Sequence, residues 1–288
     1  MTRPEVLCLG ELVWDCYPDR VFLGGAPVNV AVQLARHGVP AALLTAVGRD
    51  DLGRRALDFL RQERLTGARQ HVRLPTGTVA VTLDPAGLPT FTIHDDGAWT
   101  DLAGATAGEP MPARPSVLVF GGLAMHTETN RRLLVGLLDH WDASPQGRPS
   151  LLCDLNLRPG WSDPEVARWC LEHCHWLKLN EEEAGFLTRL EGLDIPGVLA
   201  RYGLGGICTT LGPAGLSWQG PEGAGFTLPV WSQAQGAPKV GDTVGAGDAL
   251  TAAMAAGLAA GETPEAFLER GRRWAAITCG VAGALPPR

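Results

Sequence analysis

Residues 242–251 read Asp-Thr-Val-Gly-Ala-Gly-Asp-Ala-Leu-Thr and open an Ala-rich helical stretch that runs to Ala260. The first turn of a helix leaves backbone N–H groups unpaired and carries partial positive charge, so Gly245, Ala246 and Gly247 can bring bare amides against a phosphate. Asp248 stands beside this predicted anion cradle. A carboxylate does not bind a phosphate, and here it is better suited to accept the proton of an attacking hydroxyl. The segment therefore predicts phosphoryl transfer to an alcohol.

The rest of the chain alternates short apolar runs with helical patterns. The apolar runs are Val6 to Leu9, Ala41 to Val47, Val117 to Phe120, Leu151 to Asp154, Trp176 to Leu179 and Gly206 to Thr210. The helical patterns are Val28 to His37, Asp50 or Asp51 to about Arg64, Asn130 to Trp141, Pro164 to Cys174 and Glu181 to Leu190. Such alternation predicts an α/β fold with parallel strands and crossover helices.

Two regions break this pattern. Residues 12–23 and 76–100 are strand-like, and the second contains the turn residues Asp84-Pro85-Ala86-Gly87 without a helix. They predict a small β-sheet attached to the main sheet. Because open α/β sheets bind ligands at the carboxyl ends of their strands, we expect this sheet to form a lid over the site.

Composition and charge exclude several classes of protein. With 288 residues, 45% of them hydrophobic and 19% charged, the chain resembles a soluble globular protein of one large or two small domains. A net charge of -7 and a pI near 5.5 argue against a nucleic-acid or anionic-membrane partner. The N-terminus meets Glu5 and Gly10 too early for a signal peptide, and no apolar run is long enough for a membrane span. We therefore predict a cytoplasmic protein.

The cysteines are seven in number and lie scattered through apolar segments. This distribution favours buried reduced thiols over a disulfide framework. One cluster has the residue types of a zinc site: Cys170, His173, Cys174 and His175. Since these residues share one helical segment without a second ligand pair elsewhere, core thiols and surface histidines are the better interpretation.

Residues 24–31, Gly-Gly-Ala-Pro-Val-Asn-Val-Ala, place small residues before a helix. Gly25 allows close backbone approach, and Asn29 can both donate and accept hydrogen bonds. Asp15, after the first strand, can accept from two vicinal hydroxyls, so Asp15 and Asn29 together suit a sugar. Taken singly, Asp15 is equally well a turn residue and Asn29 equally well a helix cap.

Five motifs in order resemble the ribokinase (PfkB) family of sugar kinases. They are residues 24–31 with Gly38 and Gly48, Asp154-Leu155-Asn156-Leu157-Arg158, Asn180-Glu181-Glu182-Glu183, Thr210-Leu211-Gly212-Pro213-Ala214-Gly215, and residues 242–248. The resemblance covers essentially the whole chain. It implies a single kinase domain over residues 1–288: a ribokinase-like three-layer α/β sandwich with a mostly parallel central sheet and a small β-sheet lid.

The resemblance also implies roles for individual residues. Asp248 would be the catalytic base, the amides of Gly245, Ala246 and Gly247 the anion hole, and Arg158 a contact to the phosphates. Asp15, Gly25 and Asn29 would bind the sugar. Trp99 and Trp14 flank the sugar segments, where a place in the core is the alternative to sugar contact.

The cofactors implied are ATP, Mg²⁺ and, as an option, K⁺. Asn180 and Glu183 would organise Mg²⁺ through water, although Glu181 to Glu183 also suits the acidic first turn of any helix. Asp242 and Thr243 are the candidate K⁺ ligands. The nucleotide would contact Thr210, Gly212 and Gly215, which also suit a hairpin turn, and the helix around Ala276 and Cys279 would cover the adenine. For Asp154 two interpretations remain open: it stabilises the end of a strand, or it contacts Asn180 or the waters of the metal.

The first segment, Gly10-Glu11-Leu12-Val13-Trp14-Asp15, and residues 90–99 resemble the fructokinase branch of the family. The branch implies the reaction of ATP with D-fructose to give fructose 6-phosphate. Ribose, 2-keto-3-deoxygluconate and nucleosides remain alternatives. An acidic substrate calls for a cation in the lid, and no Arg or Lys lies between Thr76 and Thr100, although Arg20, Arg49 and Arg73 could reach in.

Two other classes of function fit the sequence less well. A catalytically silent sugar-binding regulator would not need the intact Asp248 and Gly-Ala-Gly that this chain keeps. A dinucleotide-binding oxidoreductase requires Gly-x-Gly-x-x-Gly after the first strand, but Gly10 is followed by Glu-Leu-Val-Trp-Asp. Apolar residues alternate along the predicted lid, as in a half-buried sheet: Val79, Val81, Leu83, Phe91 and Ile93. By resemblance, these side chains would either form a homodimer interface through the lid sheet or cover the chain's own sugar.

Overall fold

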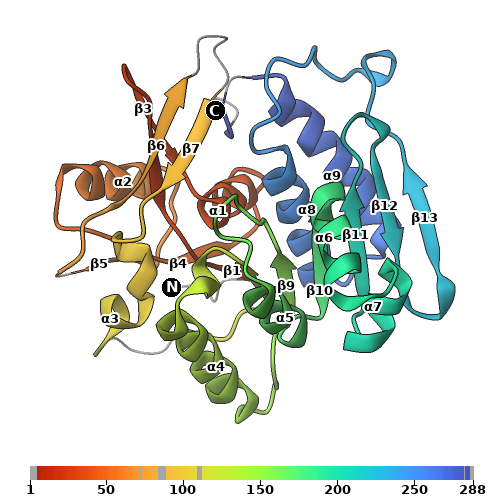
Figure 1. The fold of residues 1–288 in the computed structure, drawn as a ribbon, viewed down its shortest axis with the longest axis horizontal. Helices are drawn as coiled ribbons and strands as arrows, with labels where there is room; N and C mark the ends of the chain where they lie inside the picture. Colours follow the sequence, from red (N-terminus) through yellow and green to blue (C-terminus); the bar gives the residue numbers. More distant parts are fainter. Residues whose placement is uncertain (1–4, 72, 84–88, 109–111, 282, 286–288) are drawn as a thin grey trace.

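A large central sheet organises the computed structural model, which describes residues 5–71, 73–83, 89–108, 112–281 and 283–285 (Figure 1). Within these residues nine strands follow the order β13-β12-β11-β10-β9-β8-β1-β4-β5. The strands are β1 (Val6–Leu9), β4 (Ala41–Val47), β5 (Ala68–Gln70), β8 (Val117–Gly121), β9 (Ser150–Asp154), β10 (Trp176–Asn180), β11 (Gly206–Thr210), β12 (Leu216–Gln219) and β13 (Gly225–Leu228). The neighbours from β11 to β5 pair in parallel, whereas β11, β12 and β13 pair antiparallel.

Helices cover both faces of this sheet. One group is α1 (Ala26–Arg36), α2 (Asp51–Gln62), α8 (Ala246–Ala260) and α9 (Pro264–Cys279); the other is α3 (Leu102–Thr106), α4 (Glu128–Asp142), α5 (Pro164–Glu172), α6 (Glu181–Glu191) and α7 (Ile195–Tyr202). Successive strand residues point to opposite faces. Val6 and Cys8 accordingly join the core under the first group, and Leu7 and Leu9 the core under the second. The predicted three-layer α/β fold is confirmed.

A second sheet of four strands, in the order β3-β2-β6-β7, stands beside the first (Figure 1). It consists of β2 (Val13–Cys16), β3 (Val21–Gly24), β6 (Gly77–Leu83) and β7 (Pro89–Ile93). Strand β2 runs parallel to β6, and the other neighbours are antiparallel. These strands come from the two predicted lid regions, but the turn at residues 84–87 lies outside the described residues.

Cross-strand pairing places one row of lid residues on a common face. Phe22, Asp15, Val79 and Ile93 are register partners in turn, and Phe91 is two residues from Ile93 on the same strand. The side chains of Phe22 and Phe91 are 47% and 50% exposed. A homodimer through this sheet stays a prediction.

The structure sharpens several element boundaries. Helix α1 begins at Ala26 rather than Val28, because Pro27 suits the first helical turn. Asn29 therefore lies inside the helix and is not its cap. The helix α7 and the antiparallel pair β12–β13 were not predicted; Asp194, whose side chain accepts a hydrogen bond from the Gly197 amide, is the capping signal for α7.

The cysteines are all free thiols; Cys170 on α5 and Cys174 just after it are buried. Burial raises the pKa of the Cys174 thiol, which disfavours the reactive thiolate. The described residues hold no group of three or more His, Cys, Asp or Glu side chains placed to bind a metal ion. In the same part of the chain, no helix is long and apolar enough to cross a membrane.

Candidate active site

The segment 242–251 forms a loop that enters helix α8. Gly245 precedes the helix with a φ of 80°, in the left-handed region, and no side chain caps the helix there. A Cβ on Gly245 would also lie 2.5 Å from the carbonyl oxygen of Ala284, so the loop geometry requires glycine. No side chain caps the first-turn amides, as an anion cradle needs, although the Ala246 amide donates to the Thr243 carbonyl oxygen at 3.3 Å.

Asp248 lies in the first turn of α8 and accepts a hydrogen bond from α1. The side-chain nitrogen Nδ2 of Asn29 donates to Oδ2 of Asp248 at 2.7 Å across 219 positions of sequence. Asn29 is buried, and its Oδ1 has no hydrogen-bond partner among the described residues. This bond joins the two glycine-bearing motifs. It connects Asn29, which was predicted to hold the sugar, with Asp248, which was predicted to accept its proton.

The environment of Asp248 gives it a basicity suited to proton transfer near neutrality. Burial raises the pKa of its carboxyl to about 6, and the negative charge of Asp154 adds to the increase. The hydrogen bond from Asn29 and the positive charges of Lys178 and Arg158 act in the opposite direction. A general base works best when its pKa lies near the working pH. Its catalytic role stays a prediction.

A buried ion pair lies directly behind the cradle. Nζ of Lys178 on β10 donates to Oδ1 of Asp154 at 3.0 Å, and Oγ1 of Thr251 on α8 donates to Oδ2 of Asp154 at 2.7 Å. A Cβ on Gly247 would lie 2.8 Å from Nζ of Lys178. Burial alone would lower the pKa of Lys178, but the charges of Asp154, Glu183 and Asp248 raise it, so the ammonium stays protonated.

Lys178 was not identified from the sequence, although a signal was present. It interrupts the apolar run from Trp176 to Leu179, and a charge in a buried strand requires a partner. The two alternatives for Asp154 are also resolved in part. Its carboxylate pairs with Lys178 and Thr251, and no hydrogen bond joins it to Asn180 among the described residues.

Asn180 and Glu183 form a capping box at the start of α6. Oε2 of Glu183 accepts from the Asn180 amide and Oε1 from the Leu157 amide, each at 2.8 Å, while Oδ1 of Asn180 accepts from the Glu183 amide at 2.8 Å. Burial raises the pKa of Glu183, against the lowering charge of Lys178. Each of these oxygens still has a free lone pair. Glu183 is only 3% exposed, and organisation of Mg²⁺ by this pair through water stays a prediction.

Asp15 lies on strand β2 of the small sheet, so it is a strand residue and not a turn residue. A Cβ on Gly24 would come within 3.0 Å of its Oδ2, which shows how closely the adjacent strand approaches the carboxylate. Burial raises the pKa of Asp15, and the charge of Arg158 lowers it. Arg158 acts on Asp248 in the same way. The positive charge of Arg158 thus acts on both Asp15 and Asp248. Its contact to phosphates stays a prediction.

The two tryptophans have interior positions. Trp99 is fully buried in a cluster with Val13, Val79 and Leu123, between the lid and the body of the protein. Trp14 is 6% exposed, its Nε1 donates to the Leu52 carbonyl, and the Arg55 guanidinium lies 4.6 Å from its ring centre. Both rings contribute to packing, and contact of Trp99 with a sugar stays a prediction.

The predicted nucleotide residues lie at the ends of β11 and α9. Oγ1 of Thr210 donates to the Leu179 carbonyl at 3.2 Å. Gly212 and Gly215 flank a short turn between β11 and β12 with φ of 50° and 104°, and a Cβ on Gly215 would lie 2.1 Å from the Leu228 carbonyl oxygen. The hairpin interpretation of these glycines is correct as local structure, and it does not conflict with nucleotide contact.

Apolar surface lies open beside the end of α9, the helix that carries Ala276 and Cys279. The carbonyl oxygen of Cys279 accepts from the amides of Gly241 and Asp242, at 2.7 and 3.2 Å, so the loop before α8 is tied to this helix. Side chains from both are exposed: Val240 by 65%, Val244 by 51% and Ile277 by 44%. Contact of this surface with a nucleotide base stays a prediction.

The carboxylate of Asp242 organises the loop ahead of the cradle. Its Oδ1 accepts from the Val244 amide at 3.1 Å and its Oδ2 from the Gly283 amide at 3.0 Å. Burial alone would raise the pKa of Asp242, but hydrogen bonds from Gly283, Val244 and Thr243 outweigh it and lower the pKa. A K⁺ site at Asp242 and Thr243 stays a prediction.

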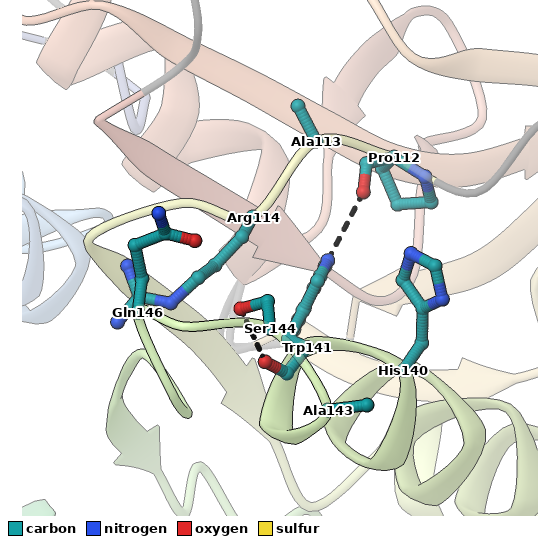
Figure 2. A pocket seen from close by; sticks show the side chains of 8 residues that line it. All are labelled: Pro112, Ala113, Arg114, His140, Trp141, Ala143, Ser144 and Gln146. Carbon is teal, nitrogen blue, oxygen red and sulfur yellow. Dashed lines mark hydrogen bonds between the residues drawn. The ribbon is translucent and has the colours of Figure 1, made fainter.

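A cavity of about 550 Å³ lies elsewhere, at the C-terminal end of α4 (Figure 2). Its lining residues are Pro112, Ala113, Arg114, His140, Trp141, Ala143, Ser144 and Gln146. Nε1 of Trp141 donates to the Pro112 carbonyl, and Oγ of Ser144 donates to the Trp141 carbonyl. The Arg114 guanidinium likewise donates to backbone carbonyls. These polar groups hold the local backbone, and none of the predicted site residues lies here.

Comparison with known proteins finds relatives that match nearly the whole chain. The sequence model of the family described as pfkB family carbohydrate kinase matches residues 6–287. The chain is 32% identical over 276 residues to the fructokinase of Salmonella typhimurium, covering 90% of this chain and 86% of that protein. Fructokinase from Xylella fastidiosa with bound ATP has a TM-score of 0.80 at 20% identity, covering 97% of this chain and 93% of that one. A fructokinase double mutant from Vibrio cholerae O395, in its fructose, ADP and potassium-ion form, has a TM-score of 0.79 at 23% identity, with coverages of 98% and 94%.

Proposed function

The chain belongs to the pfkB family of carbohydrate kinases, and on that premise we propose that it transfers the γ-phosphate of ATP to a sugar hydroxymethyl group. The leading reaction is that of D-fructose to fructose 6-phosphate. The observation that carries the proposal is the 2.7 Å hydrogen bond between Asn29 and Asp248. It orients a half-buried carboxylate in the first turn of a helix that no side chain caps, an arrangement suited to phosphoryl transfer to an alcohol.

In this proposal Asp248 accepts the proton of the attacking hydroxyl, while Asn29 holds its carboxylate in a fixed orientation. The amides of Gly245, Ala246 and Gly247 receive the charge that develops on the transferred phosphoryl group. Lys178 lies behind the same loop and neutralises Asp154. Mg²⁺, when bound through the waters of Asn180 and Glu183, would supply charge neutralisation between the phosphates.

Fructose is preferred because two kinds of observation favour it. The relative at 32% identity is a fructokinase. The lid residues between Thr76 and Thr100 include no Arg or Lys, so a neutral sugar suits this part of the site better than a sugar acid. The same lid residues would also accommodate ribose or a nucleoside, which the assay below distinguishes.

The sugar is identified by a coupled ADP-release assay with fructose, ribose, 2-keto-3-deoxygluconate, adenosine and inosine, each with ATP and Mg²⁺, with and without K⁺. We expect the highest kcat/KM with fructose. A higher value for ribose or a nucleoside would change only the substrate. No turnover with any of them, together with sugar binding by calorimetry, would favour the catalytically silent regulator.

A further inference from the structure

Glu11 is a buried acid that sequence reasoning did not assign to the site. It follows β1 and Gly10, and only 3% of its surface is exposed. One carboxylate oxygen, Oε1, accepts a hydrogen bond from the Ala26 amide at 3.3 Å. The other, Oε2, is buried without a hydrogen-bond partner among the described residues. A buried acceptor without a partner costs folding free energy, so packing alone gives little reason for an acid at this position.

Helix α1 depends on Glu11 because its own N-cap position has no side chain. Gly25 occupies that position with a φ of 108°, and no local side chain caps the helix. A Cβ on Gly25 would lie 2.4 Å from the Glu11 carbonyl oxygen, so the backbone packing excludes a capping Ser, Asp or Asn. The Glu11 carboxylate, reaching from another segment, therefore takes over the role of the N-cap side chain.

The capped end of α1 lies one turn from the residue that holds the base. The Asn29 amide donates to the Gly25 carbonyl oxygen at 3.0 Å, and Nδ2 of Asn29 donates to Asp248 at 2.7 Å. A second close contact fixes the same end, since a Cβ on Gly10 would lie 2.6 Å from Cγ of Pro27. A shift at the start of α1 would therefore move Asn29 relative to Asp248.

We propose that Glu11 is a positioning residue for the phosphoryl transfer: its carboxylate fixes the first turn of α1, and through Asn29 it sets the orientation of Asp248. The inference rests on the proposed kinase function and deepens it. The charged groups around Glu11 agree with a place at the reaction centre. Burial raises the pKa of Glu11 to about 7, the charge of Arg158 lowers it, and the charge of Asp248 raises it.

Three variants of Glu11 separate the effect of side-chain length from the effect of charge. Glu11→Gln keeps an oxygen acceptor at the same distance, Glu11→Asp keeps the charge but is one methylene shorter, and Glu11→Ala removes both. We expect near-normal kcat for the Gln variant and a roughly tenfold loss for Asp and Ala, because small displacements of catalytic groups are costly. KM for the sugar should change less than kcat. Glu5→Gln, an exposed acid before β1, is the control for charge removal and should leave kcat unchanged.

A double-mutant cycle with Asn29→Ala tests whether Glu11 acts on kcat through Asn29. If Glu11 acts through Asn29, Glu11→Ala should cost less than about twofold in kcat once Asn29 is already Ala. A full tenfold loss in that background would overturn the inference, as would equal kcat in the Ala variant and the wild type. Should the Ala variant not fold, the order of the Gln and Asp variants decides: Asp above Gln overturns the role as helix cap.

The outcomes distinguish this inference from the proposed function. Wild-type turnover on none of the sugars would remove the kinase proposal, and the positioning role with it. Turnover on any sugar, with the Glu11 variants unchanged, would leave the kinase proposal intact and overturn the role of Glu11 alone. Thermal unfolding measured alongside identifies a merely structural role, in which the melting temperature falls while kcat per folded molecule does not.

Discussion

Nδ2 of Asn29 lies 2.7 Å from Oδ2 of Asp248, and this one bond joins the two ends of the chain that carry the glycine motifs. It orients the half-buried carboxylate of Asp248. The donor is an amide and not a cation, so it orients the carboxylate and lowers its pKa without neutralising it. Asp248 can therefore remain a base near neutral pH.

Replacing Asp248 by Asn should reduce kcat by roughly 10²- to 10⁴-fold, the usual contribution of a general base. The amide keeps an oxygen for the bond from Asn29 but cannot accept the sugar proton. Steady-state kinetics and calorimetric sugar binding should therefore show lost turnover with preserved affinity. Asp139→Asn, in an exposed surface pair with Arg148, is the matched control. Turnover of Asp248→Asn within a few-fold of the wild type would rule out Asp248 as the base.

The pH profile of kcat/KM should fall on the acid side through the pKa of Asp248, which burial raises to about 6. Only the ionised carboxylate can accept a proton, so activity is lost as the pH drops below that value. The hydrogen bond from Asn29 lowers this pKa, and Asn29→Ala should accordingly move the acid limb to higher pH. Rates measured from pH 5 to 9 test both statements. An acid limb that stays in place or moves to lower pH in the variant would contradict the role of the bond.

The raised pKa of Asp248 also predicts a cost in stability. Its ordinary pKa is 3.8, so between about pH 4 and pH 6 the folded chain holds a proton that the unfolded chain has released. Stability therefore decreases as the pH rises through this window and stays lower above it. Because Asn does not ionise, Asp248→Asn should melt ~6–12 °C above the wild type at pH 8, and the difference should vanish below pH 4. Calorimetry showing a variant that is less stable at pH 8 would contradict this.

The sequence predicted local chemistry better than long-range pairing. Asp248, the glycines before it and the capping pair Asn180 and Glu183 lie within single segments, where helix-start patterns indicate them. The partners of Glu11 and Lys178 come from other elements, so no spacing in the sequence reveals them. Trp99 shows the same limit: it lies in the predicted lid segment 76–100, where the sequence left sugar contact and a place in the core open, and it is fully buried.

The bounds of helices and strands were also predicted well from local signals, whereas the pairing of strands was not. The run Ala41 to Val47 is a strand over those residues, and Asp50 caps the helix after it, because apolar runs and caps are local signals. The pairing of lid strand β2 with β6 joins segments about 60 residues apart and depends on the closure of the fold. Sequence alternation indicated the strands but not their order.

Gly245→Ala should reduce kcat by roughly 10²-fold, comparable to the loss of one donor to a developing anion. The alanine would have to adopt a φ of 80° and would meet the Ala284 carbonyl oxygen at 2.5 Å, so the loop must move. Gly261→Ala is a matched control at the other end of the same helix, with a φ of 70° and no atom within 4 Å of the new Cβ. It should lower stability by about 1 kcal/mol but leave kcat unchanged. Equal kinetics for the two variants would contradict a role for the loop.

Lys178→Met should destabilise the protein by about 3–5 kcal/mol, because it leaves the buried Asp154 carboxylate without its charged partner. Both side chains are more than nine-tenths buried, and Nζ lies 3.0 Å from Oδ1 of Asp154. Urea unfolding measures the change. Adding Asp154→Asn should restore most of the loss, since the amide is neutral and keeps an oxygen for the Thr251 hydroxyl.

The exposed pair of Arg132 and Glu128 on α4 is the control for removing a cation. Both side chains are more than half exposed, and solvent screening leaves such pairs little net effect. Arg132→Met should therefore unfold at nearly the wild-type urea concentration. If Lys178→Met unfolds there as well, or if Asp154→Asn does not rescue it, the pair does not stabilise the region behind the cradle. Rescue of stability without rescue of kcat would show that the Lys178 charge also acts on the reaction.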